Sequence, residues 1–229
     1  MLLLAIDTSG KNGSVTLARV TAGRPEVEIV ETVPLAGGTF SAQLIPQISA
    51  LLEKHGYGKK DLAAFAAVSG PGSFTGLRVG LAAIKALAEV LHKPIAAISL
   101  LEAVAQSSRS RGRVTAALEA GRGEVYTGDY ELRDREREAH SHRHSERLLG
   151  REQFLAEAKR KHVVTPDATL AELLQPAGLQ CERIAHPGSA VVARLGWERI
   201  QRGETVRPEN LEANYIRRSD AEIFSQPKS

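Results

Sequence analysis

Three short stretches of the sequence carry residue types that could do chemistry. Asp7-Thr8-Ser9 follows an apolar segment and opens a turn, where hydroxyl and backbone N–H groups could bind phosphate. Ser69 to Gly80 reads SGPGSFTGLRVG and leads from a glycine-rich turn into an apolar helix, which could bind an anion or a protein. Histidines at 140, 142 and 144 alternate, and in a strand they would share one face and could bind a metal.

The turn at Asp7-Thr8-Ser9 lacks the glycine that lets a backbone approach a phosphate, because neither position 8 nor position 9 is glycine. A turn capped by its own polar side chains is therefore favoured over a phosphate site. The second stretch is not a P-loop, because Gly76 is followed by Leu77-Arg78 and not by lysine and a hydroxyl residue.

The helix predicted from Ser73 to Leu91 has only three charged residues, which fall on one narrow stripe. Such a helix is covered on most sides. Gly72, Gly76 and Gly80 recur every fourth position and leave one face nearly bare, so that another segment can approach closely. The residues alone leave open whether that segment belongs to the same domain or to a partner.

The remaining reactive residue types give no enzyme site. His140, His142 and His144 lie in a charged run without a placed carboxylate or thiolate partner, so we expect a solvated edge strand and no metal site. The single cysteine, Cys181, excludes an internal disulfide and is interpreted as structural. Ser9, Ser69 and Ser73 lack a nearby general base in sequence, so we predict no catalytic residue.

The elements that position these residues alternate between strands and helices. Strands are expected at 2–6, 13–20, 26–33, 63–68 and 95–98, and helices at 41–55, 73–91 and 99–106. After a linker rich in serine and arginine at 107–113, a similar order of elements repeats and ends with a helix at 189–201. The sequence thus predicts an N-terminal lobe at 1–106, a C-terminal lobe at 107–204 and a tail at 205–229.

Charge is distributed unevenly along the 229 residues. Residues 1–106 carry nine Lys/Arg and eight Asp/Glu, against 21 and 19 in the rest, for a net charge of +3. A charge-poor first half either buries most of its surface or keeps an apolar face for a partner. Because no apolar run reaches the ~18 residues of a membrane span, we expect no membrane partner. The single cysteine favours a reducing compartment, so we expect a cytoplasmic protein.

Five motifs, in order and nearly spanning the chain, resemble the TsaB family, accessory proteins in the biosynthesis of threonylcarbamoyladenosine in tRNA. They are AIDTS at 5–9, SGPGSFTGLRVG at 69–80, SLLEA at 99–103, GEVY at 123–126 and YIR at 215–217. The chain departs from the family at Phe40, where histidine is common, at Glu119-Ala120-Gly121, usually Asp-Ala-Arg, and at Ala213, often proline.

The resemblance implies an α/β fold of two tandem actin-like lobes (ASKHA, ribonuclease H-like), each of βββαβαβα type, the second less regular. Asp7, Thr8 and Ser9 would be vestigial phosphate-loop positions. Leu100 and Val104 occupy the positions of the metal-binding histidines of the paralogue TsaD, and neither can bind a cation. No cofactor is therefore expected on this chain, and ATP and metal are expected on partner subunits.

The implied function is a non-catalytic scaffold for threonylcarbamoyl transfer to adenosine-37 of tRNA. Implied partners are the TsaD transferase, the TsaE ATPase, a second copy of the chain and, through the complex, tRNA. The alternative is an active enzyme of this fold, an ATP-dependent kinase or a metallopeptidase. The residues expected at the partner interface are Leu44, Ile48, Gly72, Ser73, Phe74, Gly76, Leu77, Arg78, Gly80, Leu81, Ile84 and Lys85.

Overall fold

The structure, a computed structural model, describes residues 1–132 and 141–216, with the side chains of 141–144 left out. It has two compact units, each with its own five-stranded sheet. The first unit contains Met1–Ala103 and His186–Ala213, and the second contains Val104–Ala185 and the chain from Asn214 onward. No helix within the described ranges is long and apolar enough to cross a membrane.

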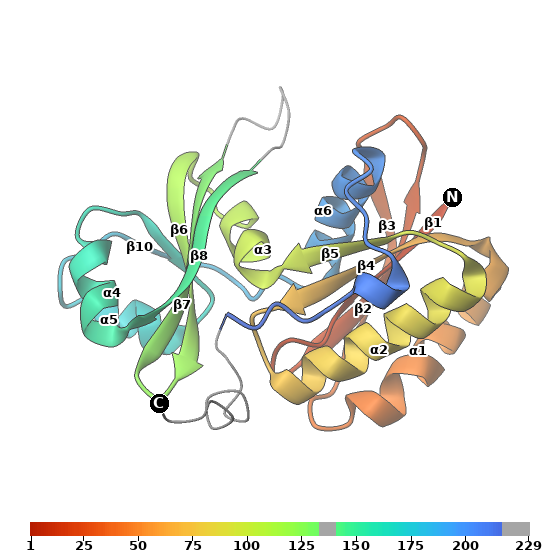
Figure 1. The fold of residues 1–229 in the computed structure, drawn as a ribbon, viewed down its shortest axis with the longest axis horizontal. Helices are drawn as coiled ribbons and strands as arrows, with labels where there is room; N and C mark the ends of the chain where they lie inside the picture. Colours follow the sequence, from red (N-terminus) through yellow and green to blue (C-terminus); the bar gives the residue numbers. More distant parts are fainter. Residues whose placement is uncertain (133–140, 217–229) are drawn as a thin grey trace, which may run out of the picture. The chain divides into compact units, whose positions relative to one another are not determined.

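The first unit is built on a sheet with the strand order β3-β2-β1-β4-β5 (Figure 1). An antiparallel meander of β1 (Leu2–Asp7), β2 (Gly13–Val20) and β3 (Val27–Leu35) is extended by β4 (Leu62–Gly70) and β5 (Ile95–Ser99), which continue it in parallel. Strands β1 and β4 are apolar up to Asp7 and Ser69, because both faces of the sheet are covered.

Two helices pack side by side on one face of this sheet and a third covers the other face (Figure 1). The pair is α1 (Phe40–Lys54) and α2 (Phe74–Leu91), and the short helix η1 (Lys59–Asp61) precedes β4. Ser73 caps α2, because its hydroxyl accepts a hydrogen bond from the Gly76 amide at 3.3 Å.

The helix on the opposite face is α6 (Ser189–Gln201), which the sequence had placed in the C-terminal lobe. It packs so closely on the sheet of the first unit that a Cβ on Gly196 would lie 2.3 Å from the Cβ of Ala66. Trp197 donates its indole N–H to the Arg24 carbonyl at 2.8 Å, and Arg199 bonds the Ala97 carbonyl. The chain thus returns to the first unit, contrary to the predicted lobe at 107–204.

Part of the expected tail also belongs to the first unit. The Val206 amide donates to the Ile95 carbonyl at 2.9 Å, and Leu211 is buried in the apolar core after the short helix η2 (Pro208–Asn210). The predicted tail at 205–229 is therefore wrong for residues 205–213, because edge pairing and apolar burial hold them on the unit.

The second unit has the strand order β10-β9-β6-β7-β8. Helix α3 (Leu100–Gln106) leads into it, and its antiparallel strands are β6 (Gly112–Gly121), β7 (Glu124–Leu132) and β8 (Ser141–Gly150). Strand β9 (Val163–Thr165) pairs in parallel with β6, and β10 (Cys181–Arg183) pairs in parallel with β9. Helices α4 (Arg151–Ala158) and α5 (Ala168–Leu174) supply Phe154 and Leu170 to its core.

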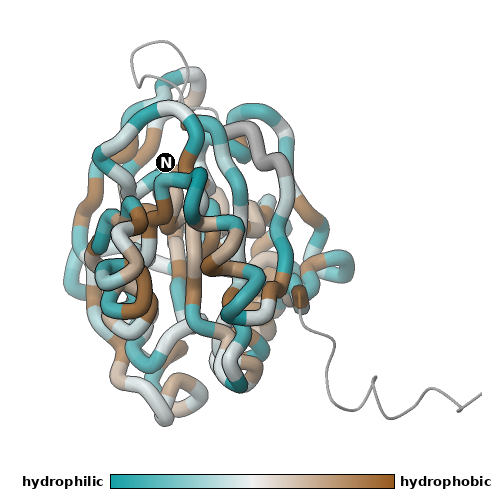
Figure 2. Tube along the Cα trace, turned by 90° about the vertical axis from the view of Figure 1, so that its left-hand side faces the viewer, coloured by the Kyte–Doolittle hydropathy of each residue, from teal (hydrophilic) through white to brown (hydrophobic). Residues whose placement is uncertain are grey.

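Hydrophobic and hydrophilic stretches alternate along the chain (Figure 2). The element order matches the predicted strand and helix order in both halves of the chain. The predicted α/β fold class is therefore confirmed.

Candidate functional site

The turn after β1 is closed by its own side chains. Asp7 is 1% exposed, and one of its carboxylate oxygens accepts hydrogen bonds from the Ser9 amide at 2.8 Å and the Ser9 hydroxyl at 2.6 Å. The other oxygen lies 3.2 Å from Nε2 of His186. These bonds make a capped turn, the arrangement that the sequence favoured.

Thr8 and Ser9 are also bonded to the first turn of α2. The Thr8 hydroxyl donates to the Gly76 carbonyl at 2.8 Å, and the Ser73 amide donates to the Ser9 carbonyl at 2.7 Å. Both Thr8 and Ser9 are buried. The groups that would contact a phosphate in an actin-like site thus hold the turn against α2.

The glycine face of α2, formed by Gly72, Gly76 and Gly80, lies against this turn. A Cβ on Gly72 would lie 2.6 Å from the Ser9 carbonyl oxygen, and one on Gly76 would lie 2.1 Å from that of Thr8. At Gly80 a Cβ would lie 2.2 Å from Oγ1 of Thr8. Real Cβ contacts are essentially never this short, so a side chain at any of these positions would require the chain's own turn to shift.

The predicted partner interface is not supported at Gly76 and Gly80, because both are buried and the Thr8–Ser9 turn occupies the space beside them, whereas Gly72 is exposed. The same correction applies to the larger apolar residues in that prediction, which are at most 5% exposed and pack into the core of the unit. Side chains buried in this way hold the helices on the sheet and are not available to a partner. These residues are Leu44, Ile48, Leu77, Leu81 and Ile84.

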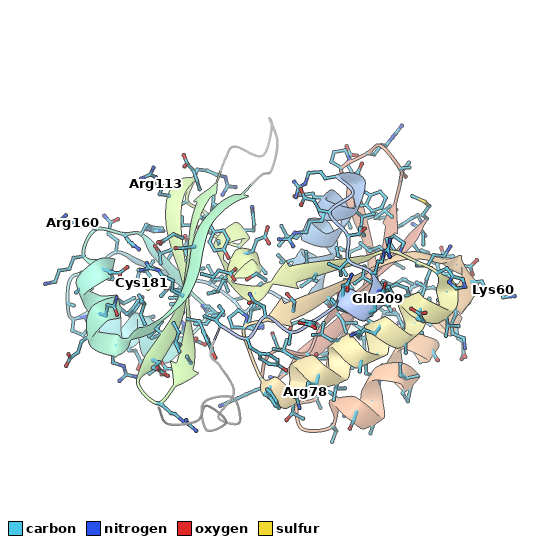
Figure 3. All side chains as sticks on the ribbon, in the orientation of Figure 1. Lys60, Arg78, Arg113, Arg160, Cys181 and Glu209 are labelled. Carbon is cyan, nitrogen blue, oxygen red and sulfur yellow. The ribbon has the colours of Figure 1, made fainter. Side chains whose placement is uncertain are left out.

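Four of the predicted interface residues are at least partly accessible besides Gly72. Ser73, Phe74 and Arg78 are exposed at the start of α2, and Lys85 is half-buried further along. The Arg78 guanidinium lies 3.7 Å from the centre of the Phe74 ring, and Figure 3 shows Arg78 at the N-terminal end of α2. This cation–π contact covers part of an exposed aromatic ring.

The outward side of α1 and α2 carries residues that the sequence reasoning missed. Ile45 is 47% exposed and Val90 is 76% exposed, although both are large and apolar. Between Arg78 and Glu89 the exposed positions of α2 are alanines. We call this surface the outer helical face; its residues are Ala42, Ile45, Pro46, Ala50, Phe74, Arg78, Ala82, Ala86 and Val90.

The apolar periodicity of α1 and α2 predicts a buried side on each helix, and this face is what the buried Leu44, Ile48 and Leu77 leave exposed. The glycine spacing drew attention to the wrong side of α2.

The other predicted positions fall in two groups. His140 lies outside the described residues, as do the side chains of His142 and His144. Leu100 and Val104 are buried apolar residues. Among the described residues, no group of three or more His, Cys, Asp or Glu side chains could hold a metal ion.

Cys181 is half-buried at the start of β10. Burial, with a smaller effect of the neighbouring Glu182 carboxylate, raises the pKa of its thiol. The thiolate is thereby disfavoured, which is opposite to the shift that activates a nucleophilic cysteine.

A family model described as "TsaD: tRNA N6-adenosine threonylcarbamoyltransferase" matches residues 34–154. The chain is similar to the tRNA threonylcarbamoyladenosine biosynthesis protein TsaB of Bacillus subtilis, with 34% identity over 58% of this chain and 57% of that protein. It is also similar to TsaB of Escherichia coli, with 34% identity over 57% of this chain and 55% of that protein. Each match thus spans little more than half of the relative's length.

The solved structure of YeaZ from Pseudomonas aeruginosa aligns with a TM-score of 0.74 and 25% identity, over 93% of this chain and 99% of that one. The likeness confirms the predicted actin-like (ASKHA-type) fold with its two five-stranded sheets. The family model covers more than half of the 229 residues, and the relatives and the solved structure agree with it. The chain therefore belongs to the TsaB family.

Proposed function

We propose that the chain is a non-catalytic scaffold subunit required for threonylcarbamoyl transfer to adenosine-37 of tRNA. In this proposal it binds a TsaD-like transferase through the outer helical face, and a TsaE-like ATPase joins the pair. The names of the relatives support the pathway, because TsaB proteins are named for threonylcarbamoyladenosine biosynthesis.

The observation that carries the proposal is the composition of the outer helical face. It presents Ile45, Phe74 and Val90 among exposed alanines, with Arg78 as a charged member, and the exposed Glu53 and Glu89 lie toward the C-terminal ends of the two helices. Large apolar side chains at the surface mark interaction sites, and small residues between them let a partner helix approach closely. Because α1 and α2 lie side by side, helices of a partner can pack on their exposed sides and form a helical bundle that contains both proteins.

The bonding of the Asp7 turn supports a scaffold over a nucleotide-dependent enzyme. The Thr8 hydroxyl and the Ser9 amide and hydroxyl are all bonded within the unit. A phosphate would have to displace these bonds, and their loss would leave buried groups unpaired.

Reconstituted tRNA modification tests the proposal. The chain is mixed with the TsaD-like subunit, the TsaE-like ATPase, the threonylcarbamoyl-adenylate donor and tRNA, and modified adenosine is measured. Ala86→Arg should abolish the stimulation of modification, because a long cation replaces a methyl group on the outer helical face. The matched control is Ala156→Arg on the exposed side of α4, which should stimulate modification like the unchanged chain.

A second variant separates scaffold from enzyme. Asp7→Asn keeps the oxygen that accepts from Ser9 but removes the charge that metal or phosphate chemistry would need. If the chain is a scaffold, a folded Asp7→Asn variant should support full modification. Loss of modification with an unchanged melting temperature and unchanged binding to the TsaD-like subunit would instead show a catalytic role.

A further inference from the structure

Two positively charged segments meet at one end of the second sheet. The amide of Thr115 donates to the His162 carbonyl at 2.8 Å, and the Ser110 hydroxyl lies 3.1 Å from Nε2 of His162. The segment that leads into β6 and the turn before β9 therefore lie together, and Figure 3 labels Arg113 and Arg160 on this unit. We call this surface the basic edge; its residues are Arg109, Arg111, Arg113, Lys159 and Arg160.

The cations of the basic edge are poorly neutralised. The side chains of Arg109 and Arg113 are 87% and 84% exposed, and each contacts a single carboxylate, at 3.4 and 3.9 Å. Arg111, Lys159 and Arg160 have no carboxylate partner in the part of the chain that the structure describes. Exposed ion pairs with such long distances stabilise a protein little, so these side chains are available to another anion.

The carboxylate closest to the basic edge is withdrawn from the surface. Glu182 is 10% exposed and accepts hydrogen bonds from the Ser108 hydroxyl at 2.6 Å and the Arg109 amide at 2.9 Å. The Arg111 guanidinium donates to the carbonyls of Ser108 and Ser110. The backbone that presents the arginines is thus fixed, which lowers the entropic cost of binding.

The chemistry of the basic edge fits nucleic acid better than protein. The exposed large hydrophobic residues of the described chain all lie outside its two segments, so it lacks the apolar anchors of a protein interface. It also lacks an aromatic ring on which an unpaired base could stack. What remains is an array of cations, which matches the phosphates of an RNA double helix.

We propose that the basic edge binds the phosphate backbone of a double-stranded region of tRNA, so that this subunit contacts the substrate directly. The choice of tRNA rests on the proposed function. Recognition would depend on charge and shape and would be insensitive to base sequence.

The test is the affinity of the full chain for fluorescently labelled tRNA, alone and with the TsaD-like subunit, at several salt concentrations. The triple variant Arg111→Ala, Lys159→Ala, Arg160→Ala should bind at least tenfold more weakly near 100 mM salt. The slope of log affinity against log salt should fall by about 2 to 3, since each phosphate contact contributes about 0.9. The matched control removes three exposed cations elsewhere, Lys59→Ala, Lys60→Ala and Arg207→Ala, and should keep affinity and slope.

Equal tRNA affinities of the two triple variants would overturn the inference. So would loss of binding to the TsaD-like subunit without loss of tRNA affinity, because the basic edge would then serve a protein. If the chain binds tRNA through the basic edge but does not bind the TsaD-like subunit, the proposed function is contradicted and this inference is supported.

Discussion

Substitutions at Gly80 and Thr8 test whether the turn after β1 is what makes glycine necessary in α2. A Cβ on Gly80 would lie 2.2 Å from Oγ1 of Thr8 and 3.1 Å from Cδ1 of Ile6. Replacing glycine by alanine inside a helix normally stabilises by about 1 kcal/mol. Overpacking of this kind costs about 1–3 kcal/mol. Gly80→Ala should therefore leave the free energy of unfolding unchanged or lower it by up to about 2 kcal/mol.

Once the Thr8 hydroxyl is removed, Gly80→Ala should raise the free energy of unfolding where it otherwise lowers it or leaves it unchanged. Thr8→Ala alone loses the hydrogen bond to the Gly76 carbonyl and should cost about 1 kcal/mol. In the Thr8→Ala background, the nearest atoms to the new methyl group at position 80 are Cδ1 of Ile6, at 3.1 Å, and the Cβ of residue 8, at 3.4 Å. The first is the flexible end of a side chain and the second is an ordinary contact. Gly80→Ala should then stabilise by about 0.5–1 kcal/mol, and the coupling energy of the pair should reach about 1–3 kcal/mol.

Urea unfolding of the four proteins in this cycle measures the coupling energy. Gly76→Ala is the matched control, because its Cβ would lie 2.1 Å from the backbone oxygen of Thr8, which Thr8→Ala retains. The loss of stability in Gly76→Ala should therefore persist in the Thr8→Ala background. Additive free energies for Gly80 and Thr8, or rescue of Gly76→Ala by Thr8→Ala, would refute the reasoning.

Two further predictions concern buried carboxylates. Burial raises the pKa of Glu198 to about 7 from the ordinary 4.5, so the folded chain keeps a proton that the unfolded chain releases. The free energy of unfolding should fall as pH rises from about 5 to 7, and thermal melts of Glu198→Gln should show a flatter profile; an unchanged profile would contradict this. Against the effect of burial, hydrogen bonds from Ser108 and Arg109 lower the pKa of Glu182 to about 2, so its contribution is present above pH 4.5 and lost toward pH 2. At pH 7, Glu182→Gln should speed cleavage by trypsin after Arg109, and equal rates would speak against a fixed segment.

Local patterns predicted most of the individual elements. The sequence indicates a helix from Ser73 to Leu91, and α2 spans Phe74–Leu91. The apolar period of that stretch, its serine cap and the following Pro94 are all local signals, so no distant contact is needed to read them. The turn at Asp7 was likewise predictable, because its side chains bond to the backbone two residues on.

Local patterns did not reveal which distant segment each element meets. The apolar periodicity of α6 does not say which sheet the helix covers, and in the structure Gly196 packs against Ala66 of the first sheet. The four-residue spacing of Gly76 and Gly80 predicts a close approach, but Thr8, 68 residues from Gly76, supplies it. The outer helical face could be identified only after the buried sides of α1 and α2 were known, because burial depends on packing.

The affinity between this chain and the TsaD-like subunit, measured by titration calorimetry, tests the central claim most directly. The account predicts that the unchanged chain and Ala156→Arg bind equally, and that Ala86→Arg binds at least tenfold more weakly while melting at the same temperature. Equal affinity of all three proteins, or the absence of any binding, would contradict the claim that the outer helical face joins this chain to its transferase.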